Sequence, residues 1–372
     1  MEVATIVVDS GAYSTRAGYG GELEPQCIIP TVIGRQKTNS NEKLHTSSSK
    51  DLFIGSEVFD QSKIINLKCP ITDRVITSMD EMQSVWSYIF TKELNINTEV
   101  SPVLLTESPQ NPKAIREKTT EIFMESFKVP AFYMAYPGVL SLYASGMFNG
   151  LVIDAGETIT QVLPVFQCWG LSHLTGRLDV GGRSLNAYLK KLLTDRGVSL
   201  VQNSETIRDI KEKMCYVAKN YQVEMNKNDV HDESTIYTLP DDTQISVGSQ
   251  RFTCPELFFK PSNFGISGGG LTEIIENVLS KVDSDILPLI TSNVVLSGGS
   301  SMFDNFADRV QSEMQDSLNP ALKINVTAPP NRKHSAWIGG SILVSLSTFS
   351  QMWITQEEYN EIGPEIINLK CY

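Results

Sequence analysis

One short pattern occurs twice in the chain. Residues 6–21 read IVVDSGAYSTRAGYGG, and residues 151–166 read LVIDAGETITQVLPVF. Each begins with an apolar run typical of a buried strand, reaches an aspartate, turns through a small residue and a glycine, and continues as a second strand. The repeat predicts two strand-turn-strand hairpins, one in each of two related halves.

A strand that ends at aspartate and turns through glycine places a carboxylate and backbone N–H groups at one edge. Such N–H groups bind phosphate oxygens, and the carboxylate binds Mg²⁺, usually through water. We expect Asp9 and Asp154 to hold the hydration shell of the cation, and Arg16 to reach a phosphate. Two such hairpins that face each other across a cleft would clamp a triphosphate between two lobes. Gly11 and Gly156 would shape the turns.

An isolated Asp-x-Gly is more often an ordinary turn at the end of a strand. Here it recurs, and a third strand-like segment ends in the pair Gly298-Gly299. Glycine pairs let a flat ligand approach the backbone closely. The combination therefore favours a ligand site over two unrelated turns.

Length and composition indicate a globular protein of two lobes. The chain has 372 residues, 41% hydrophobic content and 20% charged residues, which suits two hydrophobic cores. The net charge of −12 argues against direct binding to nucleic acid. No apolar run approaches the roughly 20 residues that span a bilayer. No basic segment precedes the first strand, so we expect a cytoplasmic protein, with the nucleus as an alternative.

The cysteines and histidines do not predict a metal centre. The six cysteines are scattered without a CxxC pair, which fits reduced thiols better than a disulfide framework. Cys371 is equally consistent with an exposed, reactive thiol and with a passive one. The four histidines, His334 among them, have no second ligand at metal-binding spacing, so they are interpreted as lone surface residues.

Strand and helix patterns alternate along the chain, which indicates an α/β fold. Helical patterns cover residues 79–94, 111–127 (with Pro112 as first helical residue), 181–197, 204–221 and 302–314, and a buried helix is expected over 335–354. Two polar insertions are expected at residues 35–51 and 226–248, the second closing as a hairpin at Pro240-Asp241-Asp242.

The sequence resembles actin and the actin-related proteins over essentially its whole length. The segments VLSLYASG (139–146), RDIKEKMCYVA (208–218), APPNRKHSAWIGGSILVSLSTFSQMWIT (328–355) and NLKCY (368–372) carry the likeness, in order along the chain. VPAFYM and YTLPDD are similar to segments of testis-type actin-related proteins.

The resemblance implies the two-lobed actin/Hsp70/sugar-kinase ATPase fold, with a mixed sheet and helices in each lobe. Residues 1–136 plus 337–372 would form the first lobe, with a small insertion subdomain at about 33–69. Residues 137–336 would form the second, with an insertion at about 182–260. Hinges are expected near residues 136–141 and 332–336.

The resemblance also implies a binding site for ATP or ADP with Mg²⁺. The matching positions in the adenosine pocket are Lys211, Glu212, Gly299, Phe303 and Lys333, with Gly182 and Arg183 beside them. Taken without the resemblance, Lys211 and Glu212 could equally belong to a solvated helix face. The matching phosphate-loop positions are Ala12 and Tyr13 in the first hairpin and Glu157 and Thr158 in the second.

Several positions depart from the actin pattern. Pro137 replaces the glutamine that helps to position the attacking water, and Gln161 replaces a histidine that is a candidate proton relay. A positioned acid or base typically contributes about 10²- to 10⁴-fold to a rate, so we expect hydrolysis slower than in actin by at least one such factor. Tyr13 adds bulk to the first turn, and Arg16 replaces a lysine. We therefore expect no catalytic residue of the actin type, and at most a weak ATPase.

Partner surfaces are expected to differ as well. The polar segment 38–51 replaces an apolar loop used in filaments, and residues 264–274 carry three successive glycines. A groove that receives partner helices in the family would be kept. The sequence thus favours a divergent actin-related scaffolding protein of the cytoskeleton that acts through other subunits; a polymerising actin-like ATPase and a small-molecule kinase are the alternatives. The groove residues are Tyr143, Ala144, Gly146, Phe148, Leu343, Leu346, Thr348 and Met352.

Overall fold

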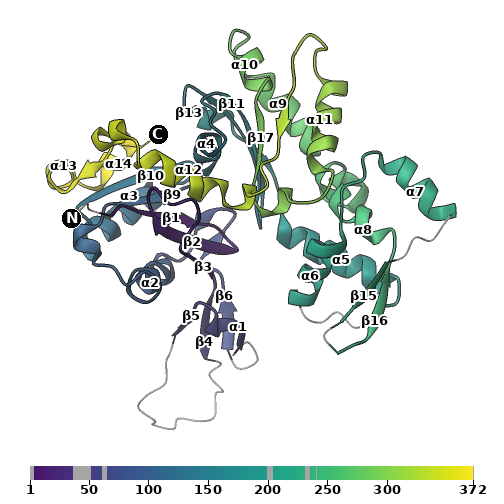
Figure 1. Ribbon diagram of the computed structural model, residues 1–372, viewed down its shortest axis with the longest axis horizontal. Helices are drawn as coiled ribbons and strands as arrows, with labels where there is room; N and C mark the ends of the chain where they lie inside the picture. Colours follow the sequence, from purple (N-terminus) through teal and green to yellow (C-terminus); the bar gives the residue numbers. More distant parts are fainter. Residues whose placement is uncertain are drawn as a thin grey trace. The chain divides into compact units, whose positions relative to one another are not determined.

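The computed structural model describes residues 4–36, 52–60, 65–198, 204–230, 235–239 and 241–371. The chain divides into two compact units, residues 1–146 with 334–372 and residues 147–333. Each unit contains a sheet, covering helices and a hydrophobic core of its own (Figure 1). The mixed α/β class is confirmed. The lobe boundaries and hinges expected from the sequence stay predictions.

The first unit is built on a six-stranded sheet in the order β19-β10-β9-β1-β2-β3. β1, β9 and β10 run parallel, and β2 pairs antiparallel with β1. The central strands are apolar runs that are buried along their length, as in sheets covered on both faces. The strands are β1 (Ile6–Ser10), β2 (Ser14–Tyr19), β3 (Cys27–Pro30), β9 (Val103–Thr106), β10 (Ala131–Ala135) and β19 (Ile354–Thr355).

Helices from both ends of the sequence cover this sheet, and Figure 1 shows the yellow C-terminal helices beside the purple and blue N-terminal elements. An aromatic cluster of Trp86, Phe90, Phe123 and Phe132 fills the core, with Phe123 stacked on Phe132 at 4.5 Å. The helices are α2 (Met79–Tyr88), α3 (Lys113–Glu121), α4 (Pro137–Ala144), α12 (Ser335–Val344), α13 (Gln356–Ile362) and α14 (Ile367–Lys370); π-turns extend α2 over Ile89–Glu93 and α3 over Ile122–Ser126.

Helices α4 and α12 cross at close range. A Cβ at Gly339 would lie 1.7 Å from the Leu140 carbonyl oxygen, so only glycine fits at this crossing. Residues 335–341 are buried, as predicted, but α12 ends at Val344 instead of continuing to 354. The serines that follow favour this end, because Ser345 Oγ bonds back to the Ser341 carbonyl and residues 345–348 are exposed. Pro112 is likewise the N-cap of α3 and not its first helical residue.

A small three-stranded sheet, β5-β4-β6, forms a separate part of the first unit. Phe53, Val58 and Ile65 make its core, with Val32 packed against them. Its elements are β4 (Ile33–Gln36), β5 (Leu52–Ile54), α1 (Glu57–Asp60) and β6 (Ile65–Lys68), followed by the hairpin of β7 (Ile71–Thr72) and β8 (Val75–Ile76). The polar insertion at 38–51 lies outside the described residues.

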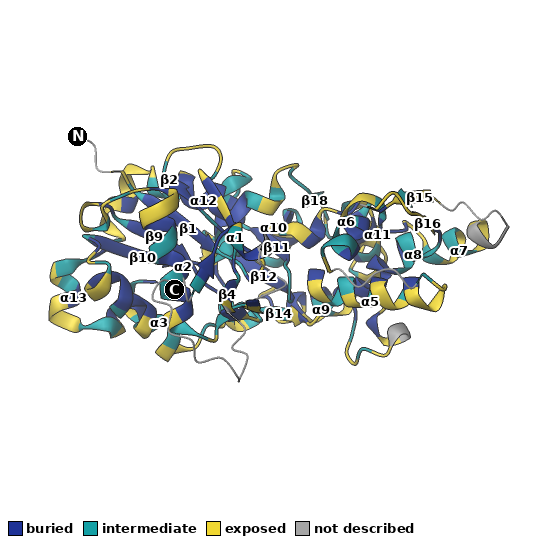
Figure 2. Cartoon of the chain, turned by 90° about the horizontal axis from the view of Figure 1, so that it is seen from below, coloured by how far each residue is buried: buried dark blue, intermediate teal, exposed yellow. Residues whose placement is uncertain are grey.

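The second unit has a sheet in the order β13-β12-β11-β17-β18, with β14 also paired to β12. β11, β17 and β18 run parallel, and β12 folds back antiparallel on β11. The interior strands are dark blue in Figure 2, under helices whose outer faces are exposed. The strands are β11 (Gly150–Ala155), β12 (Thr160–Phe166), β13 (Trp169–Gly170), β14 (Gly176–Leu178), β17 (Val294–Ser297) and β18 (Val326–Thr327).

The rest of the second unit is largely helical. The predicted hairpin is confirmed as β15 (Thr235–Thr238) and β16 (Gln244–Val247), whereas the polar segment before it is helical to residue 230. The helix predicted over 204–221 ends at Met214, because Tyr216 N–H bonds to the Arg251 carbonyl and Val217 N–H to the Asp304 carbonyl. The helices are α5 (Gly182–Asp195), α6 (Ser204–Met214), α7 (Tyr221–Val230), α8 (Gln250–Thr253), α9 (Leu271–Leu279), α10 (Leu287–Thr291) and α11 (Phe306–Ser317).

Short 3₁₀ turns connect the elements of both units: Thr98–Val100, Ser172–Leu174, Pro255–Phe258, Pro261–Phe264, Gly299–Ser301, Arg332–His334, Ser347–Gln351 and Pro364–Ile366. None of the helices in the described residues is both long enough and apolar enough to cross a membrane.

Candidate functional site

The first repeated pattern forms the hairpin β1–β2. Asp9 lies directly opposite Arg16 in this antiparallel pair. The turn is closed by the Gly11 N–H, which donates to the Ser14 carbonyl at 3.1 Å. A Cβ at Gly11 would meet the same oxygen at 3.1 Å, so the turn is tight there. The sequence prediction of a strand-acid-turn-strand unit is confirmed for this segment.

Asp9 is buried and has both carboxylate oxygens bonded. Oδ1 accepts from Thr106 Oγ1 at 2.9 Å, and Oδ2 accepts from Arg16 Nη1 at 3.0 Å. Thr106 Oγ1 in turn accepts from the Ser10 N–H at 3.1 Å, which fixes the orientation of the threonine. Because both side chains of the Asp9–Arg16 pair are largely buried, the pair is a charge-assisted bond shielded from water. A cation that binds Asp9 would therefore bind a carboxylate that is already paired with Arg16.

Arg16 has a second fixed partner that sequence reasoning missed. Its Nε donates to Nδ1 of His334 at 2.9 Å. His334 is half-buried at the N-cap of α12, so its interpretation as a lone surface histidine is wrong. Since the two residues lie 318 positions apart, no local pattern could have connected them.

The two residues that replace the small phosphate-loop residues lie in different environments. Ala12 is buried, and its carbonyl accepts from the Cys69 thiol at 3.1 Å. Tyr13 is 40% exposed, and its carbonyl accepts from the Thr31 N–H at 3.0 Å. The backbone of the turn is thus held by bonds from Cys69 and Thr31, while Tyr13 stays partly exposed.

Pro137 is the first residue of α4, where a missing N–H costs nothing. It is half-buried, and its carbonyl oxygen accepts from Ser141 Oγ at 2.8 Å. The side chain offers neither donor nor acceptor. Pro137 can therefore stabilise the start of the helix, but it has no side-chain group that could orient a water.

The second repeated pattern forms the hairpin β11–β12, in which Asp154 lies opposite Gln161. Both side chains belong to buried residues, with 8% and 4% of their surface exposed. The Gly156 N–H donates to the Ile159 carbonyl at 3.1 Å and closes the turn. The same strand-acid-turn-strand unit is therefore confirmed here, with an amide in place of the first hairpin's guanidinium.

The turn of the second hairpin packs against the start of α5. The Gly182 N–H donates to the Gly156 carbonyl at 3.0 Å, and the Arg183 N–H donates to the Glu157 carbonyl at 2.7 Å. Ser300 Oγ also donates to the Gly156 carbonyl, at 2.8 Å. The N–H groups at the start of a helix have no partner within the helix and often bind anions. Here the N–H groups of Gly182 and Arg183 bind the carbonyls of the turn instead.

A buried acid and a buried lysine lie beside this turn. Lys211, on α6, donates from Nζ to the Gly182 carbonyl at 3.2 Å. Burial lowers the pKa of Lys211, and the negative charge of Glu157 opposes that shift. Burial raises the pKa of Glu157, while the charges of Lys211 and Arg183 oppose the rise. The charge of each group therefore favours the charged form of the other. Lys211 is buried, so the interpretation that placed it on a solvated helix face is wrong.

The remaining polar residues of this region differ in their surroundings. Glu212 and Arg183 are exposed, and Glu212 forms an ion pair with Arg208 at 3.6 Å, so the solvated-face interpretation describes this part of α6. Thr158 Oγ1 is buried and has no hydrogen-bond partner among the described residues. Lys333 is exposed and Phe303 belongs to the buried core of the second unit.

The two glycines after β17 have opposite roles. Gly298 has a φ of +85°, and a Cβ there would lie 2.2 Å from the Ala155 carbonyl oxygen and 2.5 Å from Asp154 Oδ1. Gly299 is exposed, with no atom within 4 Å of its would-be Cβ. Gly298 therefore lets β17 approach Asp154, whereas Gly299 leaves open backbone to which a ligand has access.

The residues predicted for a partner groove divide between the two units. Tyr143 and Ala144 end α4 and are half-buried, as is Leu343 near the end of α12. Tyr143, Ala144 and Leu343 therefore lie near the C-terminal ends of two helices that pack against each other. Phe148 is 60% exposed and belongs to the second unit. Gly146, Leu346, Thr348 and Met352 are exposed residues of the first unit.

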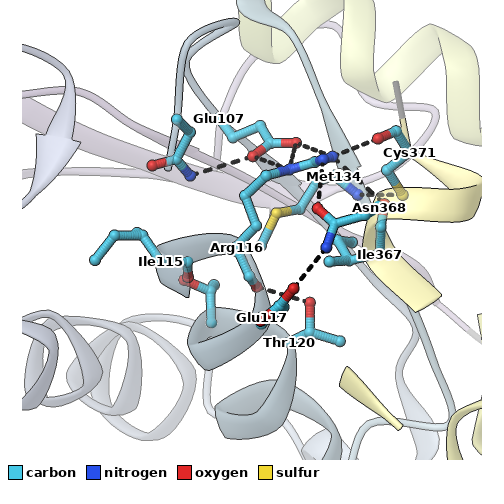
Figure 3. A network of polar contacts seen from close by, with 11 residues as sticks. Glu107, Ile115, Arg116, Glu117, Thr120, Met134, Ile367, Asn368 and Cys371 are labelled. Carbon is cyan, nitrogen blue, oxygen red and sulfur yellow. Dashed lines mark hydrogen bonds and ion pairs between the residues drawn. The ribbon is translucent and has the colours of Figure 1, made fainter. Parts of the chain in front are cut away.

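The C-terminal segment is fixed by an arginine whose side chain is largely buried (Figure 3). Arg116 forms a bidentate pair with Glu107, with Nη2–Oε1 at 2.8 Å, and also donates to the carbonyls of Ile367 and Cys371. Burial raises the pKa of the Cys371 thiol to about 12. The alternative of an exposed, reactive Cys371 is therefore wrong, and all six cysteines are free thiols.

Asp9 and Asp154, each taken by itself, suit a magnesium ion held through water better than a directly coordinated metal. The described residues contain no group of three or more His, Cys, Asp or Glu side chains that could hold a metal. Asp9 and Asp154 each stand near the end of a strand and keep 8% of their surface exposed. A carboxylate in such a position suits Mg²⁺, which keeps several waters and needs only one or two carboxylates.

The family model described as Actin matches this chain over residues 1–372.

Proposed function

The chain belongs to the actin family, and from that premise we propose that it is a nucleotide-binding structural or scaffolding protein whose ATP hydrolysis is impaired. The observation that carries the proposal is the chemistry at two positions, Pro137 and Gln161. The proposed setting is the cytoskeleton, in contact with other protein subunits.

Neither of these residues can perform acid–base chemistry. Gln161 is buried on β12, and its amide cannot take up a proton near neutral pH as an imidazole can. The side chain of Pro137 has no polar atom. Its backbone carbonyl oxygen accepts a hydrogen bond from Ser141 Oγ. We expect hydrolysis slower than that of conventional actin by about 10²-fold or more, the usual contribution of one positioned group.

Nucleotide binding is supported by groups near the ends of β1, β11 and β17 and by the exposed Lys333. Asp9 and Asp154 would hold the hydration shell of Mg²⁺, and Gly299 and Lys333 would offer open backbone and a cation to the nucleotide. Bound Mg²⁺ would neutralise phosphate charge. The predicted weakening comes from the first turn, where the exposed Tyr13 ring adds bulk.

The test restores the missing groups. In Pro137→Gln combined with Gln161→His we expect single-turnover phosphate release from bound ATP to rise at least tenfold over wild type. The matched control, Pro137→Ala with Gln161→Leu, changes the same positions without adding a donor or a base and should show no gain. Wild-type turnover equal to that of conventional actin would refute the impaired hydrolysis, and failure to bind MgATP or MgADP would refute the nucleotide site.

The scaffolding role is supported by exposed apolar side chains in the segment that follows α12. Leu346 is 42% exposed and Met352 is 37% exposed, and an amphipathic partner helix recognises such anchors. We expect Leu346→Asp to abolish binding of a helix-donating actin-binding protein. Leu23→Asp is the control, because Leu23 is 84% exposed in the same unit.

A separate test addresses self-assembly. Sedimentation of the purified protein should show no salt-induced pelleting. Long filaments in electron micrographs would favour the polymerising alternative.

A further inference from the structure

We propose that His334 is a positioning residue that holds the guanidinium of Arg16 in one plane, so that the outer edge of Arg16 is presented to a phosphate group. The proposal deepens the function given above and rests on it for the identity of the ligand, a nucleotide polyphosphate. The hydrogen bonds of Arg16 support it.

Two of the three guanidinium nitrogens have fixed partners. Nε donates to His334 Nδ1 at 2.9 Å, and Nη1 donates to Asp9 Oδ2 at 3.0 Å. A guanidinium carries five N–H donors in a rigid planar fork. Within the part of the chain that the structure describes, Nη2 donates to no acceptor. The fork therefore keeps an edge with unused N–H groups, which is the geometry that binds phosphate in a bidentate manner.

The bond from His334 is what fixes the plane. With Asp9 alone, the guanidinium could turn about the single Nη1–Oδ2 contact, and Arg16 would have to lose that freedom on binding. A second bond at Nε, on a different nitrogen, removes the rotation before the ligand arrives. Preorganisation of this kind improves affinity because less conformational entropy is lost in the complex.

The fold sets the distance between His334 and Arg16. His334 is the N-cap of α12, and three residues later Trp337 donates from Nε1 to the Val7 carbonyl at 3.0 Å. Val7 lies on β1, and on β2 a Cβ at Gly18 would lie 2.9 Å from the Trp337 ring. The helix that carries the histidine is thus docked on the same hairpin that carries Arg16.

The arrangement also defines the chemistry that a replacement must supply. Because Nε of arginine always donates, Nδ1 of His334 must present a lone pair, which assigns the ring proton of the neutral form to Nε2. The side-chain oxygen of asparagine stands at about the reach of Nδ1 and also accepts. Leucine has similar bulk but cannot accept.

These properties give a three-way comparison of His334→Leu, His334→Asn and a control, His173→Leu, at an exposed histidine of the second unit. Dissociation constants for MgATP and for adenosine are measured by calorimetry on the full chain. We expect His334→Leu to weaken MgATP binding about tenfold, which corresponds to about 1.4 kcal/mol, without changing adenosine binding. His334→Asn should restore MgATP affinity to within about threefold, roughly 0.7 kcal/mol. Unchanged MgATP affinity in His334→Leu, or failure of asparagine to restore it, overturns the proposal.

A second readout needs no nucleotide. The Nε–H of Arg16, assigned by NMR from an Arg16→Lys variant, should exchange slowly in the wild type and in His334→Asn and rapidly in His334→Leu. If the wild type binds no nucleotide but shows this pattern, the nucleotide function fails and the positioning of Arg16 stands. If the Nε–H exchanges equally fast in all three proteins, the positioning by His334 is overturned whatever the nucleotide affinity.

Discussion

The two hairpins share one backbone plan but balance their charges in different places. In β1–β2 the aspartate is paired with Arg16, the residue directly opposite on the same hairpin. In β11–β12 the residue opposite the aspartate is Gln161, and the charged neighbours Glu157 and Lys211 lie in the turn and on α6. The first hairpin therefore carries its own counter-charge, whereas the second depends on a neighbouring helix.

The hairpins also differ in how tightly their surroundings enclose them. The second is pressed against β17, because Gly298 brings that strand within contact of Asp154. Gly11 in the first hairpin has only its own turn at close range. We infer that steric fit with a neighbouring strand matters most beside Asp154 in the second hairpin, and that side-chain polar bonds matter most beside Asp9 in the first. Four substitutions test that difference.

The largest effect is expected from Gly298→Ala. The residue has a φ of +85°, and its Cβ would lie 2.2 Å from a backbone oxygen that cannot move away freely. The left-handed conformation and the overpacking together should cost about 2 to 5 kcal/mol of unfolding free energy. Gly299→Ala is the matched control, since no atom lies within 4 Å of its Cβ, and urea unfolding measures both. Equal stability of the two variants would contradict the steric account of the second hairpin.

The hairpins themselves were predictable from sequence, because each is a local pattern of a strand, an acid and a turn. The residues that surround them were not. His334 meets Arg16 across 318 positions, and the burial of Lys211 depends on the packing of α6 against α5. Cys371 looks terminal in the sequence, but Arg116 binds its carbonyl, and its thiol is buried in the core of the first unit. Long-range contacts decide such cases, and no periodicity encodes them.

Helix ends show the same limit. The patterns over 204–221 and 335–354 gave the right helices with the wrong ends. After Met214 the backbone leaves the helix because the N–H groups of Tyr216 and Val217 find carbonyl partners in distant segments. Propensity alone could not place that point, since the competing partners come from tertiary structure.

The next largest effect tests the polar account of the first hairpin. Arg16→Leu removes the ion-pair partner of the buried Asp9 carboxylate. We expect this to lower the free energy of unfolding by about 2 to 3 kcal/mol. Asp9→Asn in the same chain should recover part of that loss, because a neutral amide replaces the unpaired charge. A double-mutant cycle in urea measures the coupling. Additive losses would show that Asp9 and Arg16 do not stabilise each other.

Lys211→Met should produce a smaller, pH-dependent loss in the second unit. Burial already raises the pKa of Glu157, and removal of the lysine's charge should raise that pKa further. A carboxyl whose folded-state pKa is raised contributes stability at acid pH that is lost as the pH rises through that pKa. The variant should therefore be destabilised by about 1 to 2 kcal/mol at pH 7.5 and by less at pH 5. Two controls define the origin of the effect. Lys213→Met, on the exposed side of α6, should cost under about 0.5 kcal/mol. The double variant Lys211→Met with Glu157→Gln should lose the pH dependence of stability.

The smallest effect is expected at Thr158, and it separates the hairpins most cleanly because the same substitution is available near both. Thr158 Oγ1 is buried without a partner among the described residues, so Thr158→Val removes an unsatisfied polar atom and should change stability by no more than about 1 kcal/mol, in the stabilising direction. Thr106→Val removes a hydroxyl that donates to Asp9 and accepts from the Ser10 N–H, and leaving both groups unsatisfied should cost about 2 to 3 kcal/mol. The two variants are compared by urea unfolding at one pH. If Thr158→Val proves as costly as Thr106→Val, the second turn also depends on a hydroxyl bond, and the distinction between a polar first hairpin and a sterically fitted second one does not hold.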